Sequence, residues 1–136
     1  MISYFKRKSQ NLSTAIEAVY GLRMNNESDK SLQLASETFS GMIDFDLEKI
    51  LSTGVETFIH EIRGLNYSWE YLETITKLML ETAEIYESMN KTGEAKNLKI
   101  KVLYMLKYIT QNDKTYSEAR ESEIITLEKN IQNDQL

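Results

Sequence analysis

The absence of proline constrains this chain more than any other feature of its sequence. Among 136 residues there is none, whereas the usual frequency of about 5% would give roughly seven. Proline removes a backbone donor and clashes with the preceding helical turn, so little in this sequence forces the backbone out of a helix. Apolar residues recur at intervals of three and four positions from Leu12 to Ile131, which is the helical period. We therefore predict an all-α fold.

The composition predicts a single helical domain over residues 1–136. A chain of this length can bury roughly two thirds of its unfolded surface, which is enough for one core. There is no cysteine, which excludes disulfides and thiolate chemistry and fits a reducing compartment. No window approaches the ~20 apolar residues of a membrane span, and the first residues lack the apolar run of a signal peptide. We expect a cytoplasmic protein without membrane contact.

Helix caps and periodicity together predict about six helices. A first hairpin is expected at about 9–43, a broken helix at about 46–63, a second hairpin at about 68–110 and a C-terminal helix at about 115–131. Short connections make the helices of each hairpin antiparallel neighbours. The predicted architecture is an irregular array of antiparallel helical hairpins.

Capping patterns predict where the helices begin and end. Thr53 with Glu56, and Thr115 with Glu118, match the capping box, in which two side chains satisfy the free backbone donors of a first turn. Ser68 is expected to cap the helix that follows it. The other expected boundary signals are Asn25 and Asn26, Ser28 or Asp29, and Gly64.

Two predicted helices carry more apolar surface than one neighbour can cover. In the helix that begins at Ser68, the charged residues fall within an arc of roughly 80°, and apolar side chains fill most of the remainder. The helix from about 93 to 110 has a main apolar face and a second one formed by Ile100, Leu103 and Tyr104. The second face needs either the C-terminal segment or another chain to cover it.

The second hairpin resembles a tetratricopeptide repeat. Ala83, Tyr86 and Ala95 stand at the separations of the small residues and the tyrosine of that repeat. The resemblance covers about 70 residues and implies peptide or protein binding in a concave groove. Two hairpins separated by a broken helix are also similar to a family of small bacterial proteins of unknown function, which implies no activity. Positions that depart from the repeat consensus are Met79, Thr82, Lys99 and Val102.

Lysines beside apolar residues indicate a partner-binding surface on the helix from about 93 to 110. Residues 91–107 hold five lysines against Glu94 alone, and an apolar centre with a basic rim is typical of interfaces. The predicted partner-binding residues are Lys96, Lys99, Ile100, Leu103, Tyr104 and Lys107. We expect a protein partner or a homodimer. The alternative is a regulatory protein whose lysines contact nucleic acid or another polyanion, although the net charge of −5 disfavours a general attraction to nucleic acid.

No pattern in the sequence predicts catalysis, a cofactor or a metal. The sole histidine, His60, follows Glu56 by four residues, and one histidine cannot supply the paired ligands of a di-iron bundle. No glycine-rich phosphate loop or nucleophile elbow is present. A helical-bundle enzyme or cofactor carrier is kept as a third hypothesis, which requires buried carboxylates or a deep pocket. Trp69 is assigned to the core rather than to a ligand-binding ledge.

Overall fold

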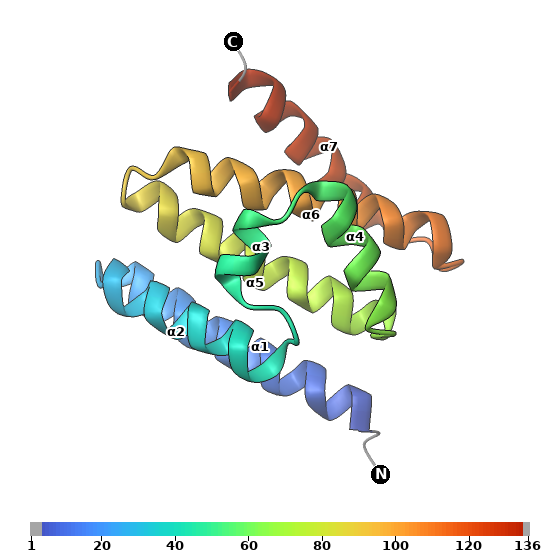
Figure 1. Ribbon diagram of the computed structural model, residues 1–136, viewed down its shortest axis with the longest axis horizontal. Coiled ribbons are helices and arrows are strands. Elements are labelled where there is room, and N and C mark those ends of the chain that lie inside the picture. The colour runs from blue at the N-terminus through green and yellow to red at the C-terminus, as the bar shows by residue number, and fades with distance from the viewer. Residues whose placement is uncertain (1–3, 135–136) are drawn as a thin grey trace.

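The computed structural model describes residues 4–134, and every regular element in that range is an α-helix (Figure 1). The seven helices are α1 (Tyr4–Met24), α2 (Ser28–Met42), α3 (Leu47–Ser52), α4 (Val55–Gly64), α5 (Trp69–Ser88), α6 (Thr92–Asn112) and α7 (Glu118–Asp134). The all-α prediction is confirmed, and the predicted broken helix is two separate helices, α3 and α4. None of the described helices is long and apolar enough to cross a bilayer.

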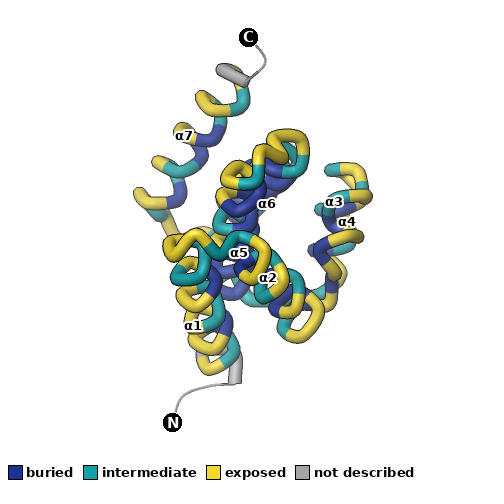
Figure 2. The backbone as a smooth tube through the Cα atoms, turned by 90° about the vertical axis from the view of Figure 1, so that its left-hand side faces the viewer, coloured by how far each residue is buried: buried dark blue, intermediate teal, exposed yellow. Residues whose placement is uncertain are grey.

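Helices α5 and α6 form an antiparallel pair at the centre of the fold. Both helices of the first hairpin pack on α5, α3 and α4 pack on α6, and α7 packs on α6 as well. Figure 2 shows α3 and α4 on one side of the central pair, with α1 and α7 on the other. Helix α5 therefore has neighbours on both flanks, as its wide apolar surface predicted.

Small and hydroxyl-bearing side chains allow these helices to approach closely. Ala35, Ala83 and Ala95 are fully buried at helix contacts, where a small side chain lets two backbones come together. The hydroxyl of Ser31 is buried too, and its Oγ donates to the carbonyl oxygen of Val19 at 2.7 Å, which joins α2 to α1. The main core cluster contains residues from all seven helices.

Three asparagines terminate helices in the left-handed conformation. Asn26, Asn66 and Asn90 have φ of 61°, 54° and 62°, and they follow α1, α4 and α5. The asparagine turn after the first helix was predicted correctly. The prediction that Gly64 would take this position was wrong, because α4 includes Gly64 and the chain reverses at Asn66 instead. Asparagine tolerates this backbone region better than other residues that have a Cβ.

Ser68 caps α5 as predicted. Its Oγ accepts a hydrogen bond from the backbone N–H of Tyr71 at 3.1 Å. The predicted start of α2 was one residue out, because Ser28 is already helical and Glu27 stands at the cap without a side-chain bond. The Oγ of Ser28 instead lies 2.9 Å from that of Ser88, at the end of α5.

Both predicted capping boxes were wrong in detail. Thr53 does not cap α4, whose N-cap is Gly54. The Oγ1 of Thr53 donates instead to the carbonyl oxygen of Lys49, so this side chain closes α3. Before α7 the cap lies two residues later than expected, because the Oγ of Ser117 accepts from the backbone N–H of Arg120 at 3.2 Å.

Candidate functional site

The second apolar face of α6 is covered only in part, and α7 of the same chain packs on this helix. Leu103 keeps only 7% of its surface exposed, and it belongs to the same buried cluster as Ile124 and Leu127 of α7. Tyr104 remains 49% exposed. Of the two alternatives left open by the sequence, the structure therefore has α7 covering Leu103 within one chain.

The lysines of the predicted partner-binding surface are largely engaged with glutamates. Lys99 Nζ forms an ion pair with Glu87, and Lys107 Nζ lies 3.5 Å from Oε1 of Glu128 on α7. Lys96 borders a hollow at the turn between α5 and α6, which Glu87 also lines. Ile100 is partly buried beside them. The six residues share α6, but little of their positive charge is free, and their role in partner binding stays a prediction.

A hollow lies between α1, α5 and α7. It consists of two adjoining parts, one of about 340 Å³ between α1 and α5 and one of about 260 Å³ between α5, α6 and α7. Both parts are bordered by Glu73 and Lys77 of α5, so they adjoin along this helix, and the two together are here called the α1–α5–α7 cleft. Figure 2 shows α1 and α7 on the same side of α5.

Helical periodicity explains which side chains line the cleft. Ser9, Gln10, Ser13 and Thr14 lie on one face of α1 because they are separated by one, three and four positions. The facing residues of α5 are Glu70, Glu73, Thr74 and Lys77. The part near α7 is lined by Thr76, Leu80, Leu106, Ser117, Ala119, Arg120 and Glu123, together with Glu73 and Lys77.

Arg120 fixes α7 against the rest of the cleft. It is 6% exposed, and its guanidinium donates to Glu73 of α5, to Oγ1 of Thr110 at 3.0 Å and to the carbonyl oxygen of Thr115 at 2.9 Å. Asp113 Oδ2 lies 3.6 Å from the same group. One buried cation therefore ties the start of α7 to α5 and to the end of α6.

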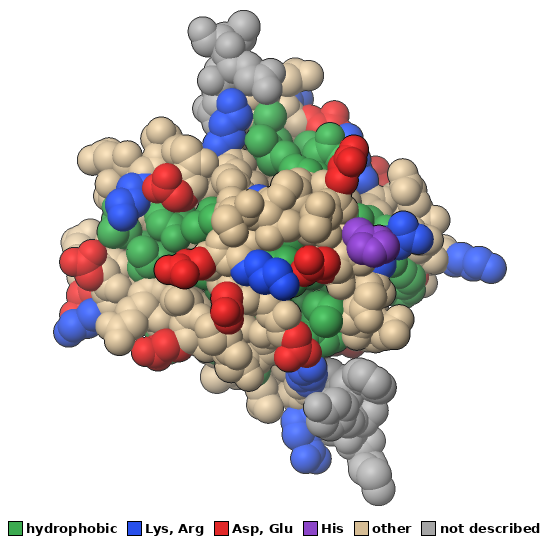
Figure 3. Space-filling model, in the orientation of Figure 1, with side chains coloured by type: hydrophobic (Ala, Val, Ile, Leu, Met, Phe, Trp, Pro, Cys, Tyr) green, Lys and Arg blue, Asp and Glu red, His purple; other side chains and the backbone are tan. Residues whose placement is uncertain are grey.

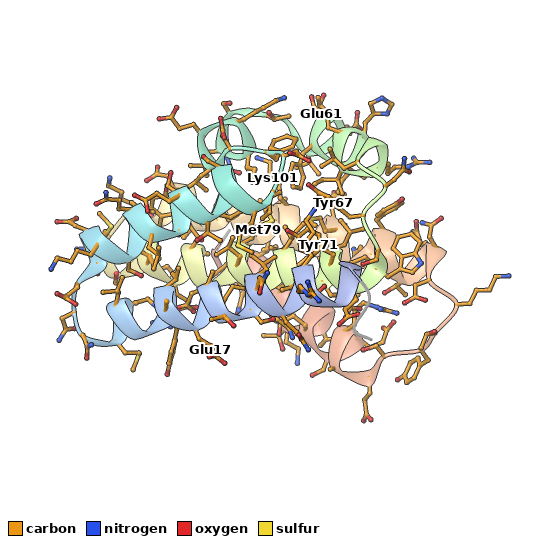
Figure 4. All side chains as sticks on the ribbon, turned by 90° about the horizontal axis from the view of Figure 1, so that it is seen from below. Glu17, Glu61, Tyr67, Tyr71, Met79 and Lys101 are labelled. Carbon is orange, nitrogen blue, oxygen red and sulfur yellow. The ribbon has the colours of Figure 1, made fainter. Side chains whose placement is uncertain are left out.

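The lining of the cleft keeps one net negative charge once the internal ion pairs are taken into account. Glu73 and Arg120 neutralise each other, which leaves Glu70 and Glu123 against Lys77 among the lining residues. Lys77 is exposed and forms no ion pair with the described residues. Glu17 of α1 is exposed but lines neither part of the cleft, and Figure 4 shows it pointing away from the layer of α3 and α4.

The face over α2, α3 and α4 has a different character. Figure 3 shows acidic and basic side chains interspersed across it, with apolar side chains scattered between them. Such a mixed surface is ordinary for a folded domain. Exposed carboxylates outnumber exposed lysine and arginine side chains over residues 28–64 as well, so the cleft differs from this face in its shape and not in the sign of its charge.

An ion pair joins α1 to α5 further along the cleft. Arg23 Nε lies 2.6 Å from Oε1 of Glu81, and Nη2 lies 3.3 Å from Oε2 of the same carboxylate. This hydrogen bonding raises the pKa of Arg23. The two-point contact sets the distance between the helices that form one wall and the floor of the cleft.

A buried hydroxyl at the cleft has no hydrogen-bond partner. Ser9 is 3% exposed, and its Oγ is the one buried side-chain polar atom among the described residues that is unsatisfied. An unpaired buried hydroxyl costs about 1–3 kcal/mol. Ser9 lines the part between α1 and α5, but its Oγ is itself buried and out of reach of a ligand in that hollow.

A second hollow surrounds the aromatic residues at the start of α5. It has a volume of about 380 Å³ and is lined by Trp69 and Tyr108, whose rings meet edge to face at 5.6 Å. The guanidinium of Arg63 lies 5.6 Å from the ring centre of Tyr108. Trp69 packs against the core, as predicted, and it also borders this hollow.

Lys101 is a buried cation that sequence reasoning missed. It was counted among the five lysines of residues 91–107, yet it is 2% exposed and faces the layer of α3 and α4 (Figure 4). Its Nζ donates to Oδ1 of Asn97, whose Nδ2 in turn donates to the carbonyl oxygen of Leu51 at 2.9 Å. Burial lowers the pKa of Lys101. The residue borders none of the hollows described above, so we assign it to the packing of α3 on α6.

The sequence contained part of the signal for the cleft. It predicted the charged arc on the helix beginning at Ser68 but gave no sign that the hydroxyl residues near Ser9 lie opposite it. The structure brings these two faces together because α1 packs on α5.

Metal binding has no support in the arrangement of side chains. Within residues that the structure describes, no three potential metal-ligating side chains gather, and His60 and Glu56 are both exposed on α4. No family model, curated protein or solved structure matches this chain.

Proposed function

We propose that this protein is a non-catalytic interaction module that binds a segment of a protein partner in the α1–α5–α7 cleft. The observation that carries the proposal is the meeting of two hollows at Glu73 and Lys77, with walls supplied by three helices. Their volumes of about 340 and 260 Å³ suit individual side chains of a peptide rather than a large cofactor. We place this function in the cytoplasm, the compartment expected for a chain without cysteine.

The hydroxyl groups of the cleft favour binding over catalysis. A nucleophilic hydroxyl needs a base within hydrogen-bond reach. Thr14 Oγ1 instead donates to the carbonyl oxygen of Gln10 at 3.0 Å, and Thr74 Oγ1 donates to that of Glu70 at 2.9 Å. These groups are committed to the backbone of their own helices, and Glu73 is committed to Arg120.

The resemblance to tetratricopeptide repeats supports the same surface. Helices α1 and α5 each begin a hairpin, and α7 follows the second hairpin, so the cleft is built from equivalent positions along the chain. Repeats of this kind create concave binding surfaces by stacking such units. We propose the resemblance as a guide to the binding face and not as an assignment to the family.

A photo-crosslinking experiment tests the proposal in cells that make the protein. A benzophenone amino acid is placed at Ser13, an exposed position that lines the cleft, and in a control at Glu56, an exposed position on α4. We expect the label at position 13 to give a discrete crosslinked product that the label at position 56 does not give. The partner captured in that product, purified separately, should bind the wild-type chain without a crosslink. An adduct of two copies of this chain would identify a homodimer. Equal labelling from both positions, or none from position 13, would contradict the proposal.

The rival proposal, contact with nucleic acid or another polyanion, depends on Lys96, Lys99 and Lys107. We favour the cleft because Lys99 and Lys107 already pair with glutamates. Phosphate binding is strongest at low salt. A duplex DNA whose electrophoretic mobility is unchanged by the protein at low salt would eliminate this rival, whereas a salt-sensitive shift would support it.

A further inference from the structure

We infer that the hollow beside Trp69 and Tyr108 binds a small aromatic carboxylate. This hollow, here called the aromatic pocket, lies where the end of α4, the start of α5 and the end of α6 come together (Figure 1). Its volume of about 380 Å³ is at the lower end of the range for small-molecule sites, which suits one ring with a short acidic chain. The pocket shares no lining residue with the α1–α5–α7 cleft, so it is a separate site with a different ligand.

The charge of the aromatic pocket selects an anion. Among the described residues that line it, only Arg63 is charged. This side chain is exposed and forms no ion pair with a carboxylate of the described residues. The N–H groups of a guanidinium form a fixed fork that matches the two oxygens of a carboxylate. An arginine without an internal carboxylate partner therefore offers a two-point contact to a carboxylate of the ligand.

The carboxylates of neighbouring residues lie outside the lining of the pocket. Glu70 stands in the first turn of α5, but it lines the part of the cleft between α1 and α5 instead. Asp44 accepts a hydrogen bond from the hydroxyl of Tyr67 at 3.1 Å and does not itself line the pocket. Lys8 Nζ lies 4.7 Å from the ring centre of the same tyrosine, which adds positive charge near the pocket. A cationic ligand would thus meet the like charge of Arg63 without a carboxylate in the lining to offset it.

The walls of the aromatic pocket select a planar ring. Trp69 and Tyr108 are both partly exposed, and their rings meet edge to face at 5.6 Å. Contacts between aromatic rings gain more than the burial of the same apolar area alone, so a third ring is favoured over an aliphatic chain. The guanidinium of Arg63 lies 5.6 Å from the ring centre of Tyr108. Because the cation and the aromatic wall are adjacent, a short chain between ring and carboxylate lets one ligand reach both.

Intrinsic fluorescence reports on the pocket directly, because Trp69 is the only tryptophan in the chain. The full chain is titrated with phenylpropionate and with three analogues that each change one property. Phenylpropylamine replaces the anion by a cation, phenylpropanol has no charge, and hexanoate keeps the carboxylate without a ring. We expect phenylpropionate to cause a saturable change in the emission of Trp69, and each analogue to bind about tenfold more weakly or not at all.

Substitution of Arg63 separates charge recognition from a structural effect. Arg63→Gln should weaken the binding of phenylpropionate about tenfold and leave the weaker binding of phenylpropanol unchanged. Arg7→Gln is the matched control, because Arg7 is also exposed, lacks a described carboxylate partner and lies outside the lining. Both variants change the net charge equally, and circular dichroism establishes that both fold.

Three results would overturn the inference. They are equal affinities for phenylpropionate and phenylpropylamine, equal effects of Arg63→Gln and Arg7→Gln, and no binding of phenylpropionate by either fluorescence or saturation-transfer NMR. None of them affects the proposed function, because the crosslinking at Ser13 probes a cleft that shares no lining residue with the aromatic pocket.

Discussion

Replacing Arg120 by methionine should detach α7 from the central helix pair. Methionine keeps an unbranched apolar stem but is shorter than arginine and removes every donor to Glu73, Thr110 and Thr115. Breaking a buried ion pair by removing one partner costs about 3–5 kcal/mol. Because the side chain of Glu73 is 34% exposed and water can rehydrate it, we expect a smaller loss, about 2–3 kcal/mol in the free energy of unfolding.

The effect should be measured globally by urea denaturation and locally by hydrogen exchange. We expect the amides of residues 118–134 to exchange much faster in Arg120→Met, while those of α5 follow the global change in stability. Glu73→Gln is the matched control, because it keeps an acceptor for the guanidinium. The double variant should be less destabilised than the sum of the two single variants, since both remove one interaction. A loss below about 0.5 kcal/mol with unchanged exchange in α7 would refute the assignment of Arg120 as the anchor.

Three further substitutions should change stability in predictable directions. Ser9→Ala removes an unsatisfied buried hydroxyl, so thermal unfolding should show a gain of about 1 kcal/mol, and a loss would mean that this hydroxyl is satisfied in solution. Ser68→Ala removes the cap of α5 and should cost about 1 kcal/mol in the same assay, whereas no change would contradict the capping role. Lys101→Met should raise the free energy of unfolding at pH 7, because burial lowers the pKa of Lys101 from its usual 10.5 and the folded state disfavours the charge. Between the lowered pKa and 10.5, the unfolded wild-type chain binds more protons than the folded one, so the free energy of unfolding of the wild type rises with pH. The difference in free energy of unfolding between Lys101→Met and the wild type should therefore become smaller in denaturation curves recorded at alkaline pH. A difference that stays constant with pH would refute this reasoning.

The sequence predicted the helices well because their apolar periodicity is local information. Every helix of the structure overlaps a predicted segment, including both parts of the broken one. Exact ends were less predictable, because neighbouring polar residues compete for the same role. Thr53 bonds back to α3 instead of capping α4, and Asn66 rather than Gly64 takes the left-handed position. Both choices depend on a backbone path that the pattern of residue types does not specify.

The candidate site was much less predictable than the fold. The cleft exists because α1 and α7 lie on the same side of α5, and helix periodicity carries no information on that arrangement. The sequence predicted that Leu103 needs a cover from either the C-terminal segment or another chain, and in the structure α7 packs on α6. The burial of Lys101 depends on α3 and α4 packing over α6, which a count of charges along a helix cannot reveal.

The arrangement of α1 and α7 around α5 is tested most directly by a distance measurement between the two walls of the cleft. The chain has no cysteine, so Ser13→Cys and Ser122→Cys, both at exposed positions, accept spin labels without competing sites. Double electron–electron resonance should give one narrow distance distribution centred on the separation of these positions in the structure. A broad or two-peaked distribution would show that α7 is not held against the central pair, and the cleft as described would not exist.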